Sequence, residues 1–359
     1  MKSGFKWAFG ILIGLIFMYL SIRDWPLDIL FSGGVHWQIL TLYSKNWSIN
    51  FGWVIAYFGT LISMHIFRTW RWKPLLAPIT KVSFWKLNRY CAVGFMMVFL
   101  LPFRLGELVR PYLISSEKEN NISMSTALAS IFVERTMDGV MIAGLMTMVI
   151  IFSTWTGSSP VLARLRAGSF IALVVFAALI AFLAALYVFK ERASNLVYKV
   201  LSYVNEHLAL KVRDMSERFL HGLTMFRSPG HFAWFIFLSA LYWMSNGFGL
   251  YILARGFHIQ IPVVAAFAMM STVVIGMMIP NSPANIGSFW FFLIMPLEAY
   301  GVSISEPNVV MYSLSVWLIQ LIQLVLFGGY FIATGKVRIH GILKKQETDM
   351  NKNMETSTK

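Results

Sequence analysis

Long apolar stretches recur along the whole sequence and restrict the folds that it can adopt. A helix needs about 20 apolar residues to cross the hydrocarbon core of a bilayer, which is about 30 Å thick. Stretches suited to this task occur at 7–22, 50–67, 90–101, 124–152, 168–189, 231–254, 263–280, 283–300 and 308–334. Charged residues make up only 13% of the 359 residues, about half the share found in soluble domains. We therefore predict an all-α, polytopic membrane helix bundle.

The chain is expected to form one integral membrane domain at 1–335, followed by a polar cytoplasmic tail at 336–359. No small-x-small cleavage site follows the apolar stretch at 7–22, so we expect an uncleaved first span. The segment at 190–230 places apolar residues at helical spacing among Lys, Arg and Glu. That pattern predicts an amphipathic helix on the cytoplasmic face of the membrane.

The distribution of Lys and Arg sets the orientation. The loops at 68–89 and 190–230, together with Lys118 and both ends of the chain, hold 22 of these residues, whereas the loops of the opposite side hold 5. Basic residues accumulate on the cytoplasmic side of membrane proteins. Both termini are therefore expected in the cytoplasm, and the membrane is expected to be a bacterial or archaeal cytoplasmic membrane.

This orientation requires a hairpin that enters from the cytoplasmic side. The stretch at 90–113 must begin and end on that side if the span at 124–152 runs outward. Its first limb, 90–101, covers only about 18 Å at 1.5 Å per residue, which is too short to cross. We predict a re-entrant hairpin that bends at Pro102.

A second hairpin is predicted to enter from the opposite side. By the same reasoning, 263–300 begins and ends outside and bends around Pro280 and Pro283. The lengths of its limbs are compatible both with crossing and with dipping into the membrane.

The two bends share the pattern Pro-x-x-x-Gly, at 102–106 and at 283–287. Opposed, interrupted segments are typical of inverted-repeat transporters, whose substrate binds where the breaks meet. The alternative is a chance match, because Pro and Gly are frequent in membrane helices. The predicted hinge residues are Pro102, Gly106, Pro280, Pro283 and Gly287.

Six charged residues fall at membrane depth: Arg104, Glu107, Arg110, Glu134, Arg135 and Asp138. Each costs about 3 kcal/mol at a helix centre on insertion scales, so they should face a cavity or each other. One interpretation is a structural ion-pair network that braces the hairpin, with Glu134 and Arg135 near the cytoplasmic interface, because a helix that starts at Met124 reaches Arg135 after only about 17 Å. The other is a substrate site in which Arg104 binds a lipid phosphate with its planar fork and Glu107 holds Arg104 in place or carries a proton.

Uncharged donors lie at the second bend, where the chain carries Asn281, Ser282 and Asn285. Such groups suit a phosphate or a small polar headgroup. The alternative is ordinary turn chemistry, because Asn-Ser-Pro is a common helix breaker.

Motifs of soluble enzymes are absent from the sequence. It has no GxSxG, HExxH or P-loop pattern, and its single cysteine, Cys91, forms neither a disulfide nor a Cys/His metal cluster. We expect no enzymatic activity, no metal and no cofactor. The net charge is +14, and the basic residues that produce it lie beside the apolar spans. Anionic membrane lipids are therefore expected as partners, and nucleic acid is not. The alternative is that Asp24 and Asp28 provide the acidic catalytic base of a membrane glycosyltransferase.

Residues 101–113, together with Glu134-Arg135 and Asp138, resemble the signature of the flippase-like membrane domain family. This family includes the membrane half of lysylphosphatidylglycerol synthase and proteins once described as dolichol-phosphate glycosyltransferase-like. The resemblance extends over about 10–335. It implies movement of an anionic, aminoacylated or isoprenoid-phosphate lipid between leaflets, with the headgroup passing through a polar cavity.

Two features depart from the pattern of this family. Its late motif is usually Gly-rich with an acidic residue after the last Gly, whereas Ala284-Asn285 and Ser288-Phe289-Trp290 occupy those places here. The aminoacyl-transferase domain of lysylphosphatidylglycerol synthases does not follow, so we expect that lysine transfer is not carried out by this chain alone. The open alternatives to a translocase are a membrane glycosyl- or group-transferase with a lipid-linked donor, and an accessory subunit in envelope polysaccharide or lipid assembly. Both alternatives are compatible with an envelope glycosyltransferase or aminoacyltransferase as a partner protein.

Overall fold

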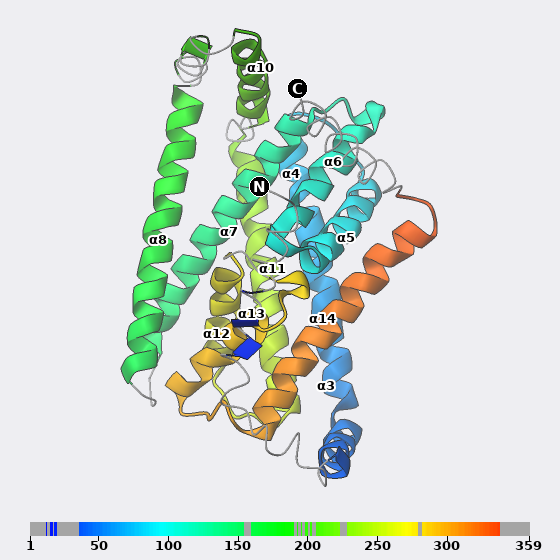
Figure 1. The fold of residues 1–359 in the computed structure, drawn as a ribbon, viewed down its shortest axis with the longest axis vertical. Helices are drawn as coiled ribbons and strands as arrows, with labels where there is room; N and C mark the ends of the chain where they lie inside the picture. The colour runs from blue at the N-terminus through cyan, green and yellow to red at the C-terminus, as the bar shows by residue number, and fades with distance from the viewer. Residues whose placement is uncertain are drawn as a thin grey trace, which may run out of the picture.

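A computed structural model describes the chain at 36–153, 159–189, 206–222, 228–278 and 282–337, with isolated positions within 12–19 and 192–202. Every regular element in this part of the chain is an α-helix or a 3₁₀ helix, and these residues include no strand (Figure 1). Four of the described helices are long and apolar enough to cross a membrane: α7 (Met124–Phe152), α8 (Ser159–Val188), α11 (Pro229–Gly256) and α14 (Pro307–Ala333). The predicted all-α, multi-pass membrane bundle is confirmed.

Helix α3 (His36–Trp70) packs along α11. It is much longer than the predicted span at 50–67, because the helix begins within the stretch expected as an outer loop. The predicted first span at 7–22 lies almost entirely outside the described residues, as do Asp24 and Asp28.

The first hairpin consists of α5 (Phe84–Leu100), the 3₁₀ helix η1 (Pro102–Leu108) and α6 (Val109–Ser116). Ser83 caps α5 by accepting a hydrogen bond from the Lys86 amide. At the other end, Leu101 is extended (φ −88°, ψ 139°), because the residue before a proline disfavours the helical conformation. The predicted break at Pro102 is therefore confirmed.

The second hairpin consists of α12 (Val263–Gly276), η4 (Pro283–Asn285), α13 (Ser288–Ile294) and η5 (Met295–Tyr300). The 14 residues of α12 span about 21 Å, and the second limb is broken into short pieces. Neither limb is long enough to cross a core of about 30 Å, so this hairpin also dips and returns. Pro280 and Asn281 lie outside the described residues.

The two hairpins enter the bundle from opposite ends (Figure 1). The helix after the first hairpin, α7, packs against α12, and the helix after the second hairpin, α14, packs against α5. Helices α3 and α11, which precede the hairpins, pack against each other, and η1 contacts η4. These contacts relate the two halves to each other in a pairwise manner, as in an inverted repeat.

The tips of the hairpins also match in backbone conformation. In each Pro-x-x-x-Gly motif the third residue has a positive φ, 57° at Arg104 and 54° at Asn285. Only a few per cent of non-glycine residues adopt this left-handed conformation. Its recurrence at the same motif position supports a real repeat over a chance match.

The amphipathic segment predicted at 190–230 contains α10 (Glu206–Gly222), which packs against α7. Thr126 donates a hydrogen bond to the Arg218 carbonyl oxygen at 2.9 Å, which joins the two helices. Near the same end of the bundle, η2 (Lys118–Asn120) carries Glu119, whose carboxylate accepts a hydrogen bond from Lys86 at 2.7 Å. That hydrogen bond lowers the pKa of the Glu119 carboxyl below its ordinary value.

Candidate functional site

Glu134 lies at the centre of a buried ion-pair network. Its carboxylate accepts hydrogen bonds from Arg71 at 3.1 Å, from Arg110 at 3.0 and 3.2 Å, and from Arg135. Arg71, Arg110 and Glu134 are all fully buried. Three guanidinium groups from α6, α7 and the junction of α3 with α4 (Trp72–Leu76) therefore converge on one carboxylate.

Asp138 extends the network by one helical turn. It accepts a hydrogen bond from Arg71 at 2.8 Å and pairs with Arg135 at 3.1 Å. The prediction that Glu134 and Asp138 share one face of a helix is confirmed, because both bind Arg71. The network ties α4 and the first hairpin to α7, so the bracing interpretation holds for Arg110, Glu134 and Asp138.

Arg71 was not among the predicted site residues. The sequence assigns it to a basic cytoplasmic loop, whereas the structure places it, fully buried, where α3 ends and α4 begins. Neighbouring Trp72 is also fully buried, and its indole nitrogen donates a hydrogen bond to Ser130 at 3.1 Å. The available signal was the spacing of Arg68 and Arg71, which share a helix face with each other directly after an apolar span.

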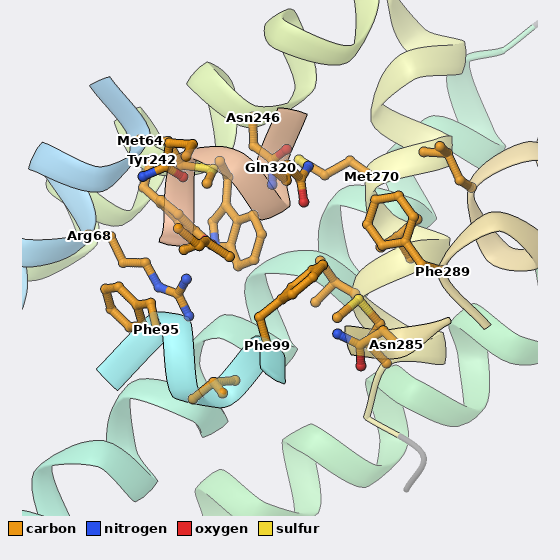
Figure 2. Close-up of a pocket in the computed structure, with 18 of the residues that line it drawn as sticks. Met64, Arg68, Phe95, Phe99, Tyr242, Asn246, Met270, Asn285, Phe289 and Gln320 are labelled. Atoms are coloured by element: carbon orange, nitrogen blue, oxygen red, sulfur yellow. The ribbon is translucent and has the colours of Figure 1, made fainter. Parts of the chain in front are cut away.

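A cavity of about 140 Å³ lies beside this network, where the two hairpin tips meet (Figure 2). Charged residues of α3, η1 and α7 and uncharged polar residues of α11, α14 and η4 line part of the cavity, and apolar side chains, mainly of α5, α12 and α13, line the remainder. The charged residues are Arg68, Arg104, Glu107 and Arg135. The uncharged polar and indole-bearing residues are Tyr242, Trp243, Asn246, Asn285, Gln320 and Gln323.

Arg68 and Arg104 differ from the other arginines of the site. Neither forms an ion pair within the described part of the chain. The Arg68 guanidinium lies over the Phe95 ring, 3.4 Å from its centroid, and Figure 2 shows it reaching toward the middle of the cavity. These two side chains are thus available to an anionic ligand.

Glu107 and Arg104 do not lie within ion-pair distance of each other. Glu107 instead lies 3.6 Å from Arg110 and 3.8 Å from Arg135. The reason is the positive φ of Arg104, which takes this residue out of the regular helical spacing that relates Glu107 to Arg110 three residues later.

The second hairpin contributes Asn285 to the cavity, opposite Arg68 (Figure 2). Ser282 has a different role, because its hydroxyl donates a hydrogen bond to the Ile286 carbonyl oxygen at 2.8 Å. Turn chemistry therefore explains Ser282, whereas Asn285 lies in position to contact a ligand. Gly287 has φ 84° and allows the sharp turn into α13.

Two glycines let the first hairpin close. A Cβ atom on Gly94 would lie 2.3 Å from Cγ of Arg110, and one on Gly106 would lie 2.1 Å from the Val98 backbone nitrogen. The predicted hinge residue Gly106 thus serves close packing of η1 on α5.

The site offers charge recognition and no ligand set for a metal. No group of three or more His, Cys, Asp or Glu side chains in the described ranges lies close enough together to hold a metal ion.

The family model of the lysylphosphatidylglycerol synthase transmembrane region matches residues 7–330. The chain belongs to this family. Membership places it among membrane proteins connected with lipid modification or translocation, and the match covers all of the charged network and both hairpins of this family member. No curated relative and no solved structure matches the chain.

Proposed function

We propose that this protein is a non-enzymatic lipid translocase. It moves a lipid with an anionic headgroup between the leaflets of a bacterial or archaeal cytoplasmic membrane, and the headgroup passes through the cavity between the hairpin tips. The observation that carries the proposal is the presence in that cavity of two arginines, Arg68 and Arg104, that lie within ion-pair distance of no carboxylate among the described residues. The excess of basic residues at one end of the bundle supports a cytoplasmic location for both termini.

The charge balance of the site favours an anion. Its arginines are Arg68, Arg71, Arg104, Arg110 and Arg135, and its carboxylates are Glu107, Glu134 and Asp138. The arginines outnumber the carboxylates by two. Charges far from water are costly unless they are paired, so an anionic group that enters the cavity relieves an existing imbalance. Arg104 and Arg68 would bind phosphate oxygens with their planar guanidinium groups.

The inverted repeat supplies a route for transport. In such proteins one bundle moves against the other around a fixed central site, which opens alternately to each side. Here each half contributes one hairpin tip to the cavity, so a relative movement of the halves would change its access.

Proteoliposomes test the proposal. Phosphatidylglycerol labelled with a fluorophore on one acyl chain should exchange between leaflets faster with the wild-type protein than in empty vesicles, as measured by dithionite quenching. Arg104→Asn should lose at least about tenfold in rate, because Asn tolerates the left-handed backbone but carries no charge. Lys86→Gln, which removes a charge remote from the cavity, is the matched control. No acceleration by the wild type, or equal rates for Arg104→Asn and the wild type, would contradict the proposal.

A further inference from the structure

We infer that the carboxylate of Glu107 accepts a hydrogen bond from a donor of the headgroup, either a hydroxyl or an ammonium group, while the arginines bind the phosphate. This inference rests on the proposed function and narrows its substrate class to phosphate lipids whose headgroup carries such a donor. It gives Glu107 a direct contact with the ligand, in addition to its place beside the ion-pair network.

Both carboxylate oxygens of Glu107 are buried and have no hydrogen-bond partner within the described part of the chain. The side chain lines the cavity and is 16% exposed. Guanidinium nitrogens of Arg110 and Arg135 lie 3.6 and 3.8 Å from these oxygens, which is beyond hydrogen-bond distance. The two arginines therefore balance the charge of Glu107 but leave its lone pairs free, and a carboxylate can accept about four hydrogen bonds.

The arginines beside Glu107 are held by other carboxylates. Arg110 donates hydrogen bonds to Glu134 at 3.0 and 3.2 Å, and Arg135 pairs with Glu134 and, at 3.1 Å, with Asp138. A shift of either arginine toward Glu107 would break these contacts. The donor for Glu107 must then come from the cavity, where a headgroup replaces water. A headgroup that offered no donor would leave the buried oxygens unsatisfied, which is unfavourable.

Glu107 lies close in the chain to the arginine proposed to bind phosphate. Arg104 and Glu107 both belong to η1, and both line the cavity of about 140 Å³. A cavity of about 150 Å³ holds one benzene molecule, so groups that contact these two side chains are separated by only a few bonds. A short headgroup, with its donor a few atoms beyond the phosphate, fits this arrangement.

The cavity suits both kinds of donor. Phe99, Trp243 and Phe289 line it, and no cation among the described residues lies over their rings (Figure 2). Such ring faces attract an ammonium group. A hydroxyl could also accept a hydrogen bond from the indole N–H of Trp243, which has no acceptor in the described ranges. The shared requirement is a donor, and the choice of lipid in the experiment identifies which one.

Three lipids with the same phosphodiester test the requirement. Phosphatidylmethanol has no headgroup donor, phosphatidylglycerol has hydroxyls, and phosphatidylethanolamine has an ammonium group. In proteoliposomes with the wild-type protein, at least one of the two donor lipids, labelled on an acyl chain, should exchange about tenfold faster than labelled phosphatidylmethanol, as expected for one hydrogen bond to a charged group. Rates for both donor lipids at or below that of phosphatidylmethanol would overturn the inference while leaving translocation intact. Failure of all three to exchange would instead count against the proposed function.

Glu107→Gln tests whether Glu107 causes the preference, because it keeps the shape of the side chain and removes the charge and one acceptor oxygen. The ratio of the donor-lipid rate to the phosphatidylmethanol rate should fall at least about threefold. A purely structural role of Glu107 would lower both rates by the same factor, and an unchanged ratio would overturn the assignment. Glu119→Gln makes the same change at an exposed carboxylate and should keep the wild-type ratio.

Discussion

Glu134 shows how a single carboxylate organises the residues around it. Its partners come from α6, α7 and the α3–α4 junction, and it is fully buried with Arg71 and Arg110. Removing one partner of a buried ion pair leaves the others uncompensated, which costs far more than the net contribution of the pair. The stability of the first hairpin in the bundle should therefore depend strongly on this residue.

Glu134→Gln is expected to destabilise the protein by about 3–5 kcal/mol, because three guanidinium groups lose their common negative charge. The midpoint of thermal unfolding in detergent would measure the effect. Glu119→Gln is the control, since this exposed carboxylate pairs with Lys86 at the surface, where water and salt screen ion pairs. Its midpoint should match the wild type. Equal midpoints for both variants would show that the network is not a brace.

The sequence identified the charged residues at membrane depth but not their pairing. Arg110, Glu134, Arg135 and Asp138 were found because charge in an apolar run is unusual. Arg71 was missed because Lys and Arg after a span are typical of a cytoplasmic loop. Backbone conformation at a turn cannot be read from spacing, so the sequence did not show that Arg104 lies beyond ion-pair distance of Glu107.

The first hairpin closes because glycine brings its limbs within van der Waals contact. Gly94 and Gly106 face Arg110 and the backbone of Val98 at distances that exclude any side chain. Arg110 cannot move aside, because Glu134 holds it.

Gly94→Ala and Gly106→Ala should each destabilise the protein by about 1–3 kcal/mol through overpacking, with the larger effect at Gly106, where the neighbour is backbone. Gly144→Ala in α7 is the matched control, since a Cβ there meets nothing within 4 Å and alanine favours a helix by roughly 0.5–1 kcal/mol. Thermal unfolding midpoints would rank the variants. A midpoint for Gly106→Ala at or above that of Gly144→Ala would contradict the packing argument.

The sequence predicted most elements correctly and their lengths less well. The prolines located both breaks in the sequence. The residue before a proline favours an extended conformation, and both Leu101 and Ser282 are extended. The start of α3 at His36 was missed because polar residues there resemble a loop. Hydropathy does not distinguish a loop from a helix that extends beyond the apolar core. The lengths of α12 and α13 were left open because an apolar run of this size suits a span or a hairpin limb.

At the scale of the whole molecule, the opposed hairpins predict that their bases lie on opposite sides of the membrane. Lys81 precedes α5 and Ser305 follows η5, and both are exposed. In the background Cys91→Ser, a membrane-impermeant maleimide added to intact cells should label Ser305→Cys and leave Lys81→Cys unlabelled until the cells are opened. Equal labelling of both cysteines in intact cells would contradict the inverted arrangement.

The two halves repeat each other in backbone but not in chemistry. The same left-handed position holds a cation in the first hairpin, at Arg104, and a neutral amide in the second, at Asn285. If the two halves also had identical side chains, the cavity would present the same surface to a headgroup that enters from either leaflet. Divergence at positions such as this pair makes the two approaches unequal, so the pathway through the bundle acquires a polarity that its symmetry does not have.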